Sequence, residues 1–234
     1  MSDKINAEAP EFQIQGAEEA EETTTTQEPV SAPLIPEGEH ALQTGWCFWY
    51  DKKLQKNADL NEYKSHLHNL GAFHTVEGFW RYYVHLKRPA ALEVNTNLHL
   101  FRHGEQYVPM WEAFPKGGCW ILKLRKTPSG PSVLSKLWHD LVLAVIGEAF
   151  AEPDVVGIGL SVRAREDLLS VWNGDNTNND VRFLIGEKLK TILGLEENTM
   201  IEYKTFKASL QDMSSYRNAK PYVFAVQNTP PKKH

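Results

Sequence analysis

A tryptophan and a glutamate stand side by side in the stretch PMWEAF, residues 109–114. Pro109 and Pro115 flank the pair and mark a turn-rich loop around Trp111 and Glu112. An indole is costly to leave in water, and a carboxylate is costly to bury unless it receives hydrogen bonds. One interpretation is that Trp111 is a core residue and Glu112 points into solvent. The other is a ligand with a flat, electron-poor face for the indole and N–H groups for the carboxylate.

Two arginines in the stretch VVGIGLSVRAR, residues 155–165, could supply the other half of such a site. The alternation predicts a strand, on which Arg163 and Arg165 share one face because they are two residues apart. That face otherwise carries glycine and serine, which leaves space for a bulky anion; the alternative is two solvated arginines. An indole for stacking, a carboxylate acceptor and two guanidinium groups describe a purine nucleotide site. Guanine offers N1–H and N2–H₂ to one carboxylate, which adenine cannot do.

Signatures of catalysis are absent from the sequence. Gly157-x-Gly159 lacks the third glycine of a dinucleotide-binding loop, and no phosphate-binding P-loop or nucleophile elbow occurs. His99 and His103 are four residues apart, but they lie in a strand-then-turn context, which argues against a metal site. We therefore expect a binding protein that is not an enzyme and that uses no metal or cofactor.

Charge is unevenly distributed along the 234 residues. Residues 1–39 contain ten acidic residues and one lysine, a net charge of −9, while the whole chain carries −5, so residues 40–234 carry +4. The first segment is rich in Thr, Glu and Pro and holds too few large apolar residues to offset chain entropy. We expect residues 1–39 to be a disordered acidic tail, residues 40–227 to be one domain, and residues 228–234 to be a disordered C-terminal tail.

Cysteine usage and targeting signals bear on the compartment. Cys47 and Cys119 are the two cysteines of the chain, which gives no disulfide framework and suits a reducing compartment. The sequence has no signal-peptide pattern and no apolar run of about 18 residues, the length of a membrane span. We expect a cytoplasmic protein, with the nucleus as an alternative, and no membrane association.

Hydrophobic periodicity predicts an α+β fold. Apolar residues recur at helical spacing in 76–86, after the candidate N-cap Thr75, and again in 132–150 and 181–195. An antiparallel sheet with helices on one face fits this order, and it leaves the other face free for a ligand. The expected strands are 46–50, 97–101, 119–125, 155–165, 168–172, 200–206 and 221–226.

Two adjacent aromatic residues on the first of these helices cannot both face the core. Phe79 and Trp80 are neighbours, and neighbouring helical positions point about 100° apart. One of them therefore marks an exposed apolar patch, of the kind that binds a partner protein.

Seven blocks of the sequence, in order, resemble the eukaryotic translation initiation factor 4E family, whose members bind the 7-methylguanosine cap of mRNA. The resemblance implies a cupped antiparallel sheet of about eight strands with three helices on its convex face and the cap in its concave face. The blocks span about residues 40–206 and read HALQTGWCFWY, TVEGFWRYY, PMWE, GGCWIL, VLAVIGEAF, GIGLSVRAREDLLSVW and IEYKT.

The resemblance implies roles in cap binding for six residues. Trp111 is expected to form one side of an aromatic sandwich around the methylated base, and Glu112 to accept hydrogen bonds from N1–H and N2–H₂. Methylation at N7 gives the base a positive charge, so the sandwich gains cation–π attraction in addition to stacking. Tyr63 is expected to be the second ring of the sandwich. Arg163 and Arg165 are expected to face the phosphates, and Trp172 is expected to contact the N7-methyl group.

On the convex side, the resemblance implies a docking surface for a partner helix with the pattern Tyr-x-x-x-x-Leu-φ, where φ is apolar. Such helices belong to 4G-type scaffolds and 4E-binding proteins, so these are the expected partners beside capped mRNA. Phe79 would then face the core and Trp80 the partner. The expected docking residues are His40, Leu42, Val76, Trp80, His139, Asp140 and Leu143.

Two departures resemble the 4E-homologous, or class II, branch, whose members often repress particular mRNAs. Tyr63 stands where the best-known members have tryptophan, and the block usually written Arg-x-Lys-x-x-Lys reads Arg163-x-Arg165-x-x-Leu168. We therefore expect weaker cap binding than in the main factor. Recruitment of an initiation scaffold and class II-type repression are both open. Two further alternatives are a glycan-binding domain, which would bind saccharides, and a scaffold that has lost the cap.

Overall fold

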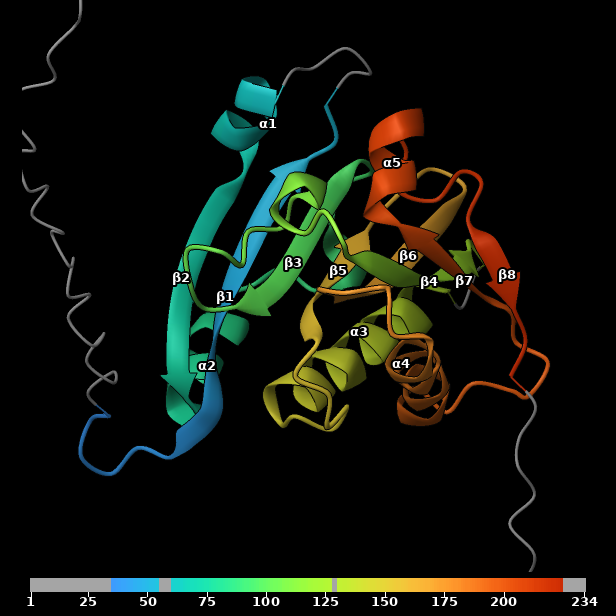
Figure 1. The fold of residues 1–234 in the computed structure, drawn as a ribbon. Coiled ribbons are helices and arrows are strands. Elements are labelled where there is room, and N and C mark those ends of the chain that lie inside the picture. Colours follow the sequence, from blue (N-terminus) through green and yellow to red (C-terminus); the bar gives the residue numbers. More distant parts are fainter. Residues whose placement is uncertain (1–34, 55–59, 128–129, 225–234) are drawn as a thin grey trace, which may run out of the picture. The chain divides into compact units, whose positions relative to one another are not determined.

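The structure, a computed structural model, describes residues 35–54, 60–127 and 130–224 (Figure 1). The expected C-terminal tail 228–234 and most of the expected tail 1–39 lie outside the described residues, so both stay predictions. Residues 35–39 are described, and the carboxylate of Glu39 accepts hydrogen bonds from Thr75 and Arg81.

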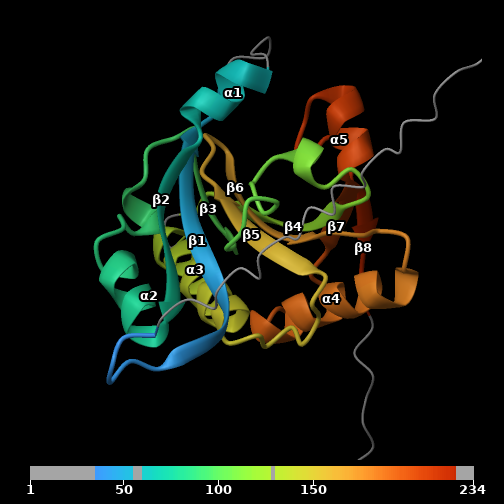
Figure 2. The same cartoon turned by 60° about the vertical axis from the view of Figure 1, so that its left-hand side comes forward.

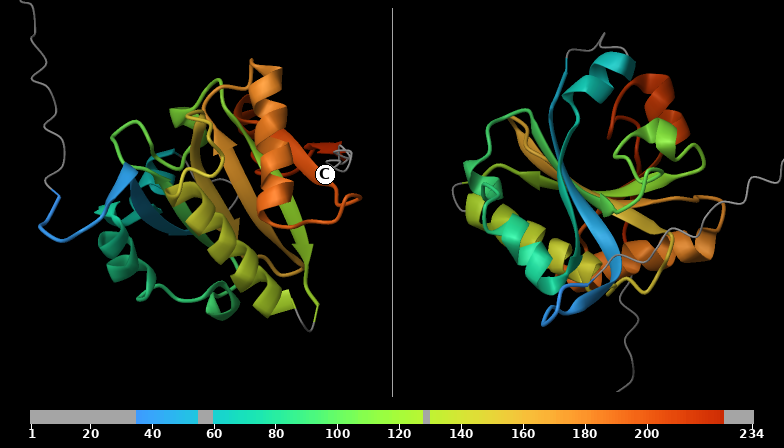
Figure 3. Two further views of the ribbon diagram at one scale, coloured as in Figure 1. Left: turned by 90° about the horizontal axis from the view of Figure 1, so that it is seen from below. Right: turned by 90° about the vertical axis from the view of Figure 1, so that its left-hand side faces the viewer.

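One sheet of eight strands forms the centre of the described part of the chain. The strand order is β2-β1-β3-β5-β6-β4-β7-β8, and each neighbouring pair is antiparallel. Figure 1 and Figure 3 show that the sheet is strongly twisted and curved. The strands are β1 (Ala41–Lys52), β2 (His68–Thr75), β3 (Thr96–Arg102), β4 (Gly118–Arg125), β5 (Val155–Ser161), β6 (Glu166–Asn173), β7 (Ile201–Thr205) and β8 (Lys220–Tyr222).

Helices cover the two faces of the sheet unequally. The three helices α2, α3 and α4 lie on the convex face, and the shorter α1 and α5 lie at the other face (Figures 2 and 3). The predicted α+β class and the three convex helices are confirmed, and no helix in the described ranges is long and apolar enough to cross a membrane. The helices are α1 (Leu60–His66), α2 (Val76–Tyr83), α3 (Gly130–Ile146), α4 (Asn179–Ile192) and α5 (Phe206–Asp212), with 3₁₀ turns η1 (Pro89–Ala91) and η2 (Trp111–Ala113).

Strand alternation produces two apolar clusters, one on each face of the sheet. On β4, Trp120 and Leu122 belong to the larger cluster, which also contains Trp138 of α3. Cys119 and Ile121 of the same strand point the other way, into a smaller cluster. The smaller cluster therefore forms the floor of the concave face, where it also contains Phe101, Phe114, Val156, Leu168, Trp172 and Phe206.

Local capping signals set the ends of the convex helices. The side chain of Thr75 accepts a hydrogen bond from the N–H of Gly78 at 2.9 Å and caps α2, as the sequence predicts. The side chain of Asn178 accepts from two N–H groups in the first turn of α4. Gly194 follows the last turn of α4 with a φ of +58°, a left-handed conformation that suits glycine at a helix end.

Candidate functional site

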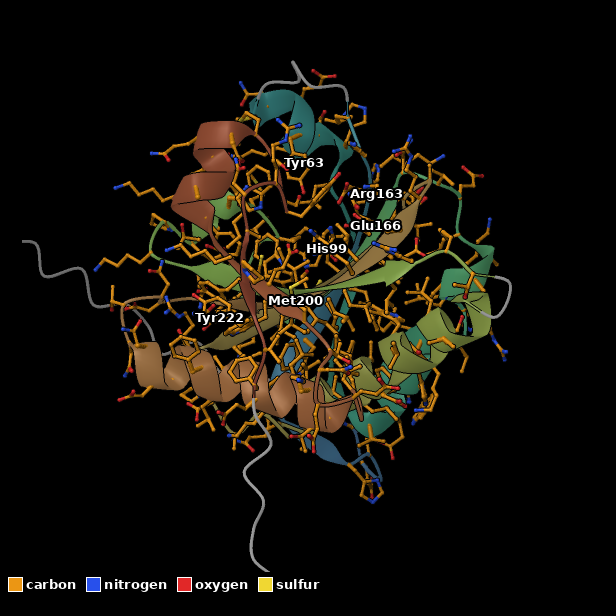
Figure 4. All side chains as sticks on the ribbon, turned by 90° about the vertical axis from the view of Figure 1, so that its right-hand side faces the viewer. Tyr63, His99, Arg163, Glu166, Met200 and Tyr222 are labelled. Carbon is orange, nitrogen blue, oxygen red and sulfur yellow. The ribbon has the colours of Figure 1, made fainter. Side chains whose placement is uncertain are left out.

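A cavity of about 320 Å³ opens on the concave face of the sheet. Its floor consists of side chains from β1, β3, β4, β5 and β6, and its walls come from α1, residues 109–112 and residues 213–217. Figure 4 shows three residues around it, Tyr63, His99 and Arg163, gathered at the side of the sheet away from the convex helices. Of the six residues predicted to bind a nucleotide, five line this cavity: Tyr63, Trp111, Glu112, Arg163 and Trp172.

Two aromatic rings border the cavity from different elements. Tyr63 on α1 donates a hydrogen bond from its hydroxyl to the carbonyl oxygen of Pro109 at 3.2 Å, which ties α1 to the loop of Trp111. Burial, together with the charges of Asp51 and Glu112, raises the pKa of Tyr63, so the phenol stays protonated and can donate. Trp111 begins η2 and is half-buried, whereas Glu112 beside it is exposed. The arrangement offers two π faces and a free carboxylate to a ligand.

Trp172 forms part of the cavity floor rather than a wall. It is 7% exposed and lies against Phe206, with 4.4 Å between the ring centroids. Its indole N–H donates to the hydroxyl of Ser170 at 3.1 Å. The indole is therefore fixed in orientation and presents a small apolar surface to the cavity.

Arg163 supplies a cation at the edge of the cavity. Nη1 donates to the carbonyl oxygens of Val162 and Thr96 at 3.0 and 3.4 Å, and Nη2 donates to Oδ1 of Asn97 at 2.7 Å. Burial lowers the pKa of Arg163 and the charge of Asp51 opposes this, but a guanidinium remains charged at neutral pH. Since a guanidinium has five N–H groups, donors remain for an anionic ligand.

The prediction that Arg163 and Arg165 share a strand face is wrong. β5 ends at Ser161, and residues 162–165 form the turn that leads to β6. The backbone N–H of Arg163 bonds to the carboxylate of Asp167 instead of to a neighbouring strand. Arg165 is consequently exposed and is not among the residues that line the cavity.

Asp51 forms a buried polar group on the cavity floor that the sequence did not predict. Asp51 is fully buried; its Oδ1 accepts from Nδ2 of Asn97 at 2.6 Å, and its Oδ2 lies 2.7 Å from Nε2 of His99. Burial opposes ionisation of Asp51, but hydrogen bonds from His99 and Asn97 outweigh it and lower the pKa of Asp51. Further cations that line the cavity, within the described residues, are Lys53 and Arg217.

The convex face brings together a second group of predicted residues. Phe79 is fully buried while Trp80 is 42% exposed, which confirms the prediction from helix geometry. Val76 of α2 and Leu143 of α3 are exposed as well. The ring centroid of His139 on α3 lies 6.5 Å from that of Trp80, so the two helices contribute to one surface. This convex apolar surface comprises Val76, Trp80, His139 and Leu143.

The other predicted docking residues lie around this surface. His40 is exposed, and its Nδ1 and backbone N–H contact the carboxylate of Glu77 at 2.7 and 2.8 Å. Hydrogen bonding to Glu77 and the charge of that carboxylate raise the pKa of His40. Asp140 is half-buried and pairs with Lys136 at 2.5 Å. Leu42 is half-buried against the larger apolar cluster and belongs mainly to the core.

Comparison with known sequences identifies the family. A family model described as Eukaryotic initiation factor 4E matches residues 41–221. The chain belongs to the eukaryotic initiation factor 4E family. Rice Eukaryotic translation initiation factor NCBP is 39% identical over 184 residues, which is 77% of this chain and 78% of the relative. Eukaryotic translation initiation factor 4E-4 of Caenorhabditis elegans is 35% identical over 211 residues, covering 85% of this chain and 96% of the relative.

Solved structures of the 4E family have the same fold. The chain is similar to C. elegans eIF4E-3, which was solved in a complex with the 4E-binding protein Mextli and a cap analog. The TM-score is 0.65 at 31% sequence identity, and the match covers 74% of this chain and 96% of that one. The fold expected from the resemblance to the 4E family is thus confirmed.

In this 4E-family chain, a buried lysine anchors one wall of the cavity. The side chain of Lys204 on β7 is 1% exposed, and its Nζ lies 2.7 Å from both carboxylate oxygens of Asp212. The same ammonium group donates to the backbone carbonyl oxygens of Ser214 and Arg217. Lys204 therefore holds the segment 213–217 against the sheet.

Substituting Lys204 with methionine tests this anchor, because it removes the ammonium group and keeps most of the volume. We expect the free energy of unfolding to fall by about 1–3 kcal/mol, since the carboxylate and two carbonyl groups lose their donor. Chemical denaturation measures the change, with Lys207→Met at an exposed position of α5 as the matched control. Equal midpoints for the two variants would contradict the anchoring role.

Proposed function

We propose that the chain binds the 7-methylguanosine cap of mRNA in the concave cavity. The observation that carries the proposal is the convergence of Tyr63, Trp111, Glu112 and Arg163 on one cavity. An N7-methylated guanine is a flat cation, so rings on α1 and η2 can hold it through stacking and cation–π attraction. The similar C. elegans eIF4E-3 structure contains a cap analog, which supports the same use of the fold.

The remaining groups match the other parts of a cap. The exposed carboxylate of Glu112 can accept hydrogen bonds from N1–H and N2–H₂ of guanine. The unused N–H donors of Arg163 suit phosphate oxygens, and the fixed indole of Trp172 offers an apolar contact to the N7-methyl group. Arg165 lies outside the cavity lining, so we propose for it a long-range attraction of the phosphates and no direct contact. The proposed activity is binding and involves no catalysis.

Retention on a 7-methyl-GTP resin tests this function. We expect the protein to bind the resin and to be eluted by free 7-methyl-GTP, while the same concentration of GTP leaves it bound. A resin carrying a neutral oligosaccharide should not retain it. Elution by both nucleotides alike, or retention on the saccharide resin instead, would contradict cap binding and favour a different ligand.

Glu112→Gln tests whether the carboxylate of Glu112 accepts hydrogen bonds from the guanine base. We expect 7-methyl-GTP to bind about 10- to 100-fold more weakly, because hydrogen bonds to a charged group contribute about 1.5–3 kcal/mol and an amide offers a neutral acceptor. Isothermal titration calorimetry measures the loss, with Glu105→Gln, an exposed position outside the cavity lining, as the control. An unchanged dissociation constant for E112Q would mean that Glu112 does not contact the base.

We further propose that the convex apolar surface binds a partner helix of the pattern Tyr-x-x-x-x-Leu-φ. Val76, Trp80 and Leu143 supply exposed apolar groups there, and Asp140 and His40 supply polar ones at the edge. The C. elegans relative was solved with a 4E-binding protein, which supports a protein partner for this fold. The partner is a 4G-type scaffold or a 4E-binding protein.

The choice between initiation and repression depends on that partner. We propose recruitment of an initiation scaffold in the cytoplasm, with class II-type repression as the second candidate. Two residues favour the second candidate: Tyr63 offers a smaller ring than tryptophan, and Leu168 lines the cavity where a third cation is usual in the family. Pull-down with immobilised peptides from each class of partner separates the two. Preferential capture by a 4G-type peptide supports initiation, and preferential capture by a 4E-binding-protein peptide supports repression.

A further inference from the structure

The cavity floor contains a buried histidine with one nitrogen engaged and one nitrogen free. His99 on β3 is 7% exposed, and its Nε2 lies 2.7 Å from Oδ2 of Asp51. Its other ring nitrogen, Nδ1, is buried and has no hydrogen-bond partner among the described residues. An unpartnered buried polar atom of this kind is destabilising unless a ligand or water forms a hydrogen bond with it. His99 therefore brings an unused hydrogen-bonding atom to the cavity that it lines.

Glycine at position 159 leaves the backbone beside this nitrogen without a side chain. Gly159 on β5 faces His99, and a Cβ placed there would lie 3.2 Å from Nδ1 and 2.9 Å from Oγ of Ser170. Any larger residue at Gly159 would cover Nδ1 from that side. His99, Gly159 and Ser170 all line the cavity.

Asp51 fixes the tautomer of His99 and thereby the hydrogen-bonding role of Nδ1. Both carboxylate oxygens of this fully buried residue accept hydrogen bonds, which fits an ionised carboxylate with Nε2–H of His99 as one donor. In the neutral imidazole, Nδ1 is then a bare acceptor; in the imidazolium it becomes a donor. Histidine is the side chain that changes charge near physiological pH, so a nearby anion can drive this change.

Arg163, the cation proposed to bind phosphate, is connected to Asp51 as well. Asn97 donates to Asp51 and accepts from Nη2 of Arg163 at 2.7 Å, so one carboxylate links the histidine and the arginine. In the view of Figure 4, His99 and Arg163 both lie below Tyr63. Asp51 (β1) bonds to His99, and Asn97 (β3) and Arg163 (turn after β5) are linked to it through Asp51, while Ser170 (β6) lies beside Gly159. Among the described residues, the other titratable side chains that line the same cavity are Lys53, Tyr63, Glu112, Cys119, Tyr216 and Arg217.

We propose that His99 is a further ligand-contact residue, which takes up a proton when an anionic phosphate chain binds beside Arg163 and donates from Nδ1 to a phosphate oxygen. A phosphate oxygen only accepts, so it pairs with the protonated ring and repels the neutral one. The ionised Asp51 balances the added charge from the other side of the ring. This inference rests on the proposed cap-binding function and adds a proton-linked contact to it.

Calorimetry of the full chain tests the proposal. Binding of 7-methyl-GTP at neutral pH is measured in buffers of different ionisation enthalpy, which reports the protons taken up, for the wild type and for His99→Gln. The glutamine amide can still donate to Asp51 but cannot titrate, and titration of the ligand itself is common to both proteins. His103→Gln, which lies against His74 and outside the cavity lining, is the matched control.

We expect the wild type and H103Q to take up more protons than H99Q, and to gain at least about threefold more affinity than H99Q between pH 8 and pH 6. An NMR titration of the His99 ring in the wild type gives an independent readout should H99Q fold poorly. The protonated fraction at neutral pH should rise with 7-methyl-GTP and stay unchanged with the nucleoside 7-methylguanosine, which lacks phosphates.

Equal proton uptake by the wild type and H99Q would overturn the proposal while leaving cap binding intact. An NMR signal of His99 that does not change when 7-methyl-GTP is added would do the same. Failure of the proposed function looks different. In that case the wild type would bind 7-methyl-GTP no better than GTP at any pH, and both proposals would fall together.

Discussion

Trp111→Ala should weaken binding of 7-methyl-GTP by about 100-fold or more. Stacking of a base on an aromatic side chain contributes about 1–3 kcal/mol, and the positive charge of the methylated base adds cation–π attraction of about 0.5–2 kcal/mol. Trp111 is half-buried at the cavity edge, with its ring against the smaller apolar cluster, so its loss should leave the strands in place. Equilibrium titration with 7-methyl-GTP measures the affinity, and thermal unfolding verifies that the variant is folded.

Two further variants make the result at Trp111 specific. Trp111→Phe keeps an aromatic face and should retain part of the affinity lost in W111A. Trp80→Ala removes an equally large indole from the opposite face of the sheet and should bind 7-methyl-GTP like the wild type. If W111A binds within threefold of the wild type, the ring of Trp111 is a core side chain and the aromatic sandwich is wrong.

Trp80→Ala should in turn weaken binding of a Tyr-x-x-x-x-Leu-φ peptide by about 30-fold or more. Tryptophans at the centre of protein interfaces commonly contribute about 2 kcal/mol or more, about a 30-fold change in affinity, and Trp80 on α2 is 42% exposed. Its ring also contacts the buried Phe79, with 4.9 Å between centroids, so it is held ready for a partner. Fluorescence anisotropy of a labelled peptide from a 4E-binding protein measures the change.

The matched control for this face is Val84→Ala. Val84 follows the last turn of α2 and is 65% exposed, but it lies outside the convex apolar surface defined above. V84A and W111A should both bind the peptide like the wild type. A peptide affinity that W80A leaves unchanged would place the partner elsewhere on the molecule, because a docked helix would necessarily cover the indole.

Much of the fold could be predicted from local patterns. The stripe that contains Phe79 and the cap at Thr75 are properties of neighbouring residues, and the structure contains both. β2 could not be predicted in this way, because HNLGAFHT has two histidines and a glycine with a φ of +127°. Pairing with β1 rather than its own composition keeps this segment extended. α1 has no buried residue, so it shows no apolar stripe in the sequence.

The site was predictable only where its residues are close in the chain. Trp111 and Glu112 are neighbours, so their joint chemistry is visible in PMWEAF. Asp51 and His99 meet because β1 and β3 align Asp51 opposite Asn97, a register that no local pattern reports. The prediction that Arg165 lies on a strand is wrong because the period-2 pattern of the sequence continues past Ser161, although the strand itself ends there.

The most direct test of the central claim is the affinity ratio between 7-methyl-GTP and GTP. Quenching of tryptophan fluorescence reports binding, because Trp111 and Trp172 line the cavity. The titrations are made at low and high salt, since phosphate contacts weaken with salt while stacking does not. We predict at least a tenfold preference for 7-methyl-GTP, about 1.4 kcal/mol, at both salt concentrations. Equal affinities, or no quenching by either nucleotide, would contradict cap binding and leave the convex surface as the functional part of the molecule.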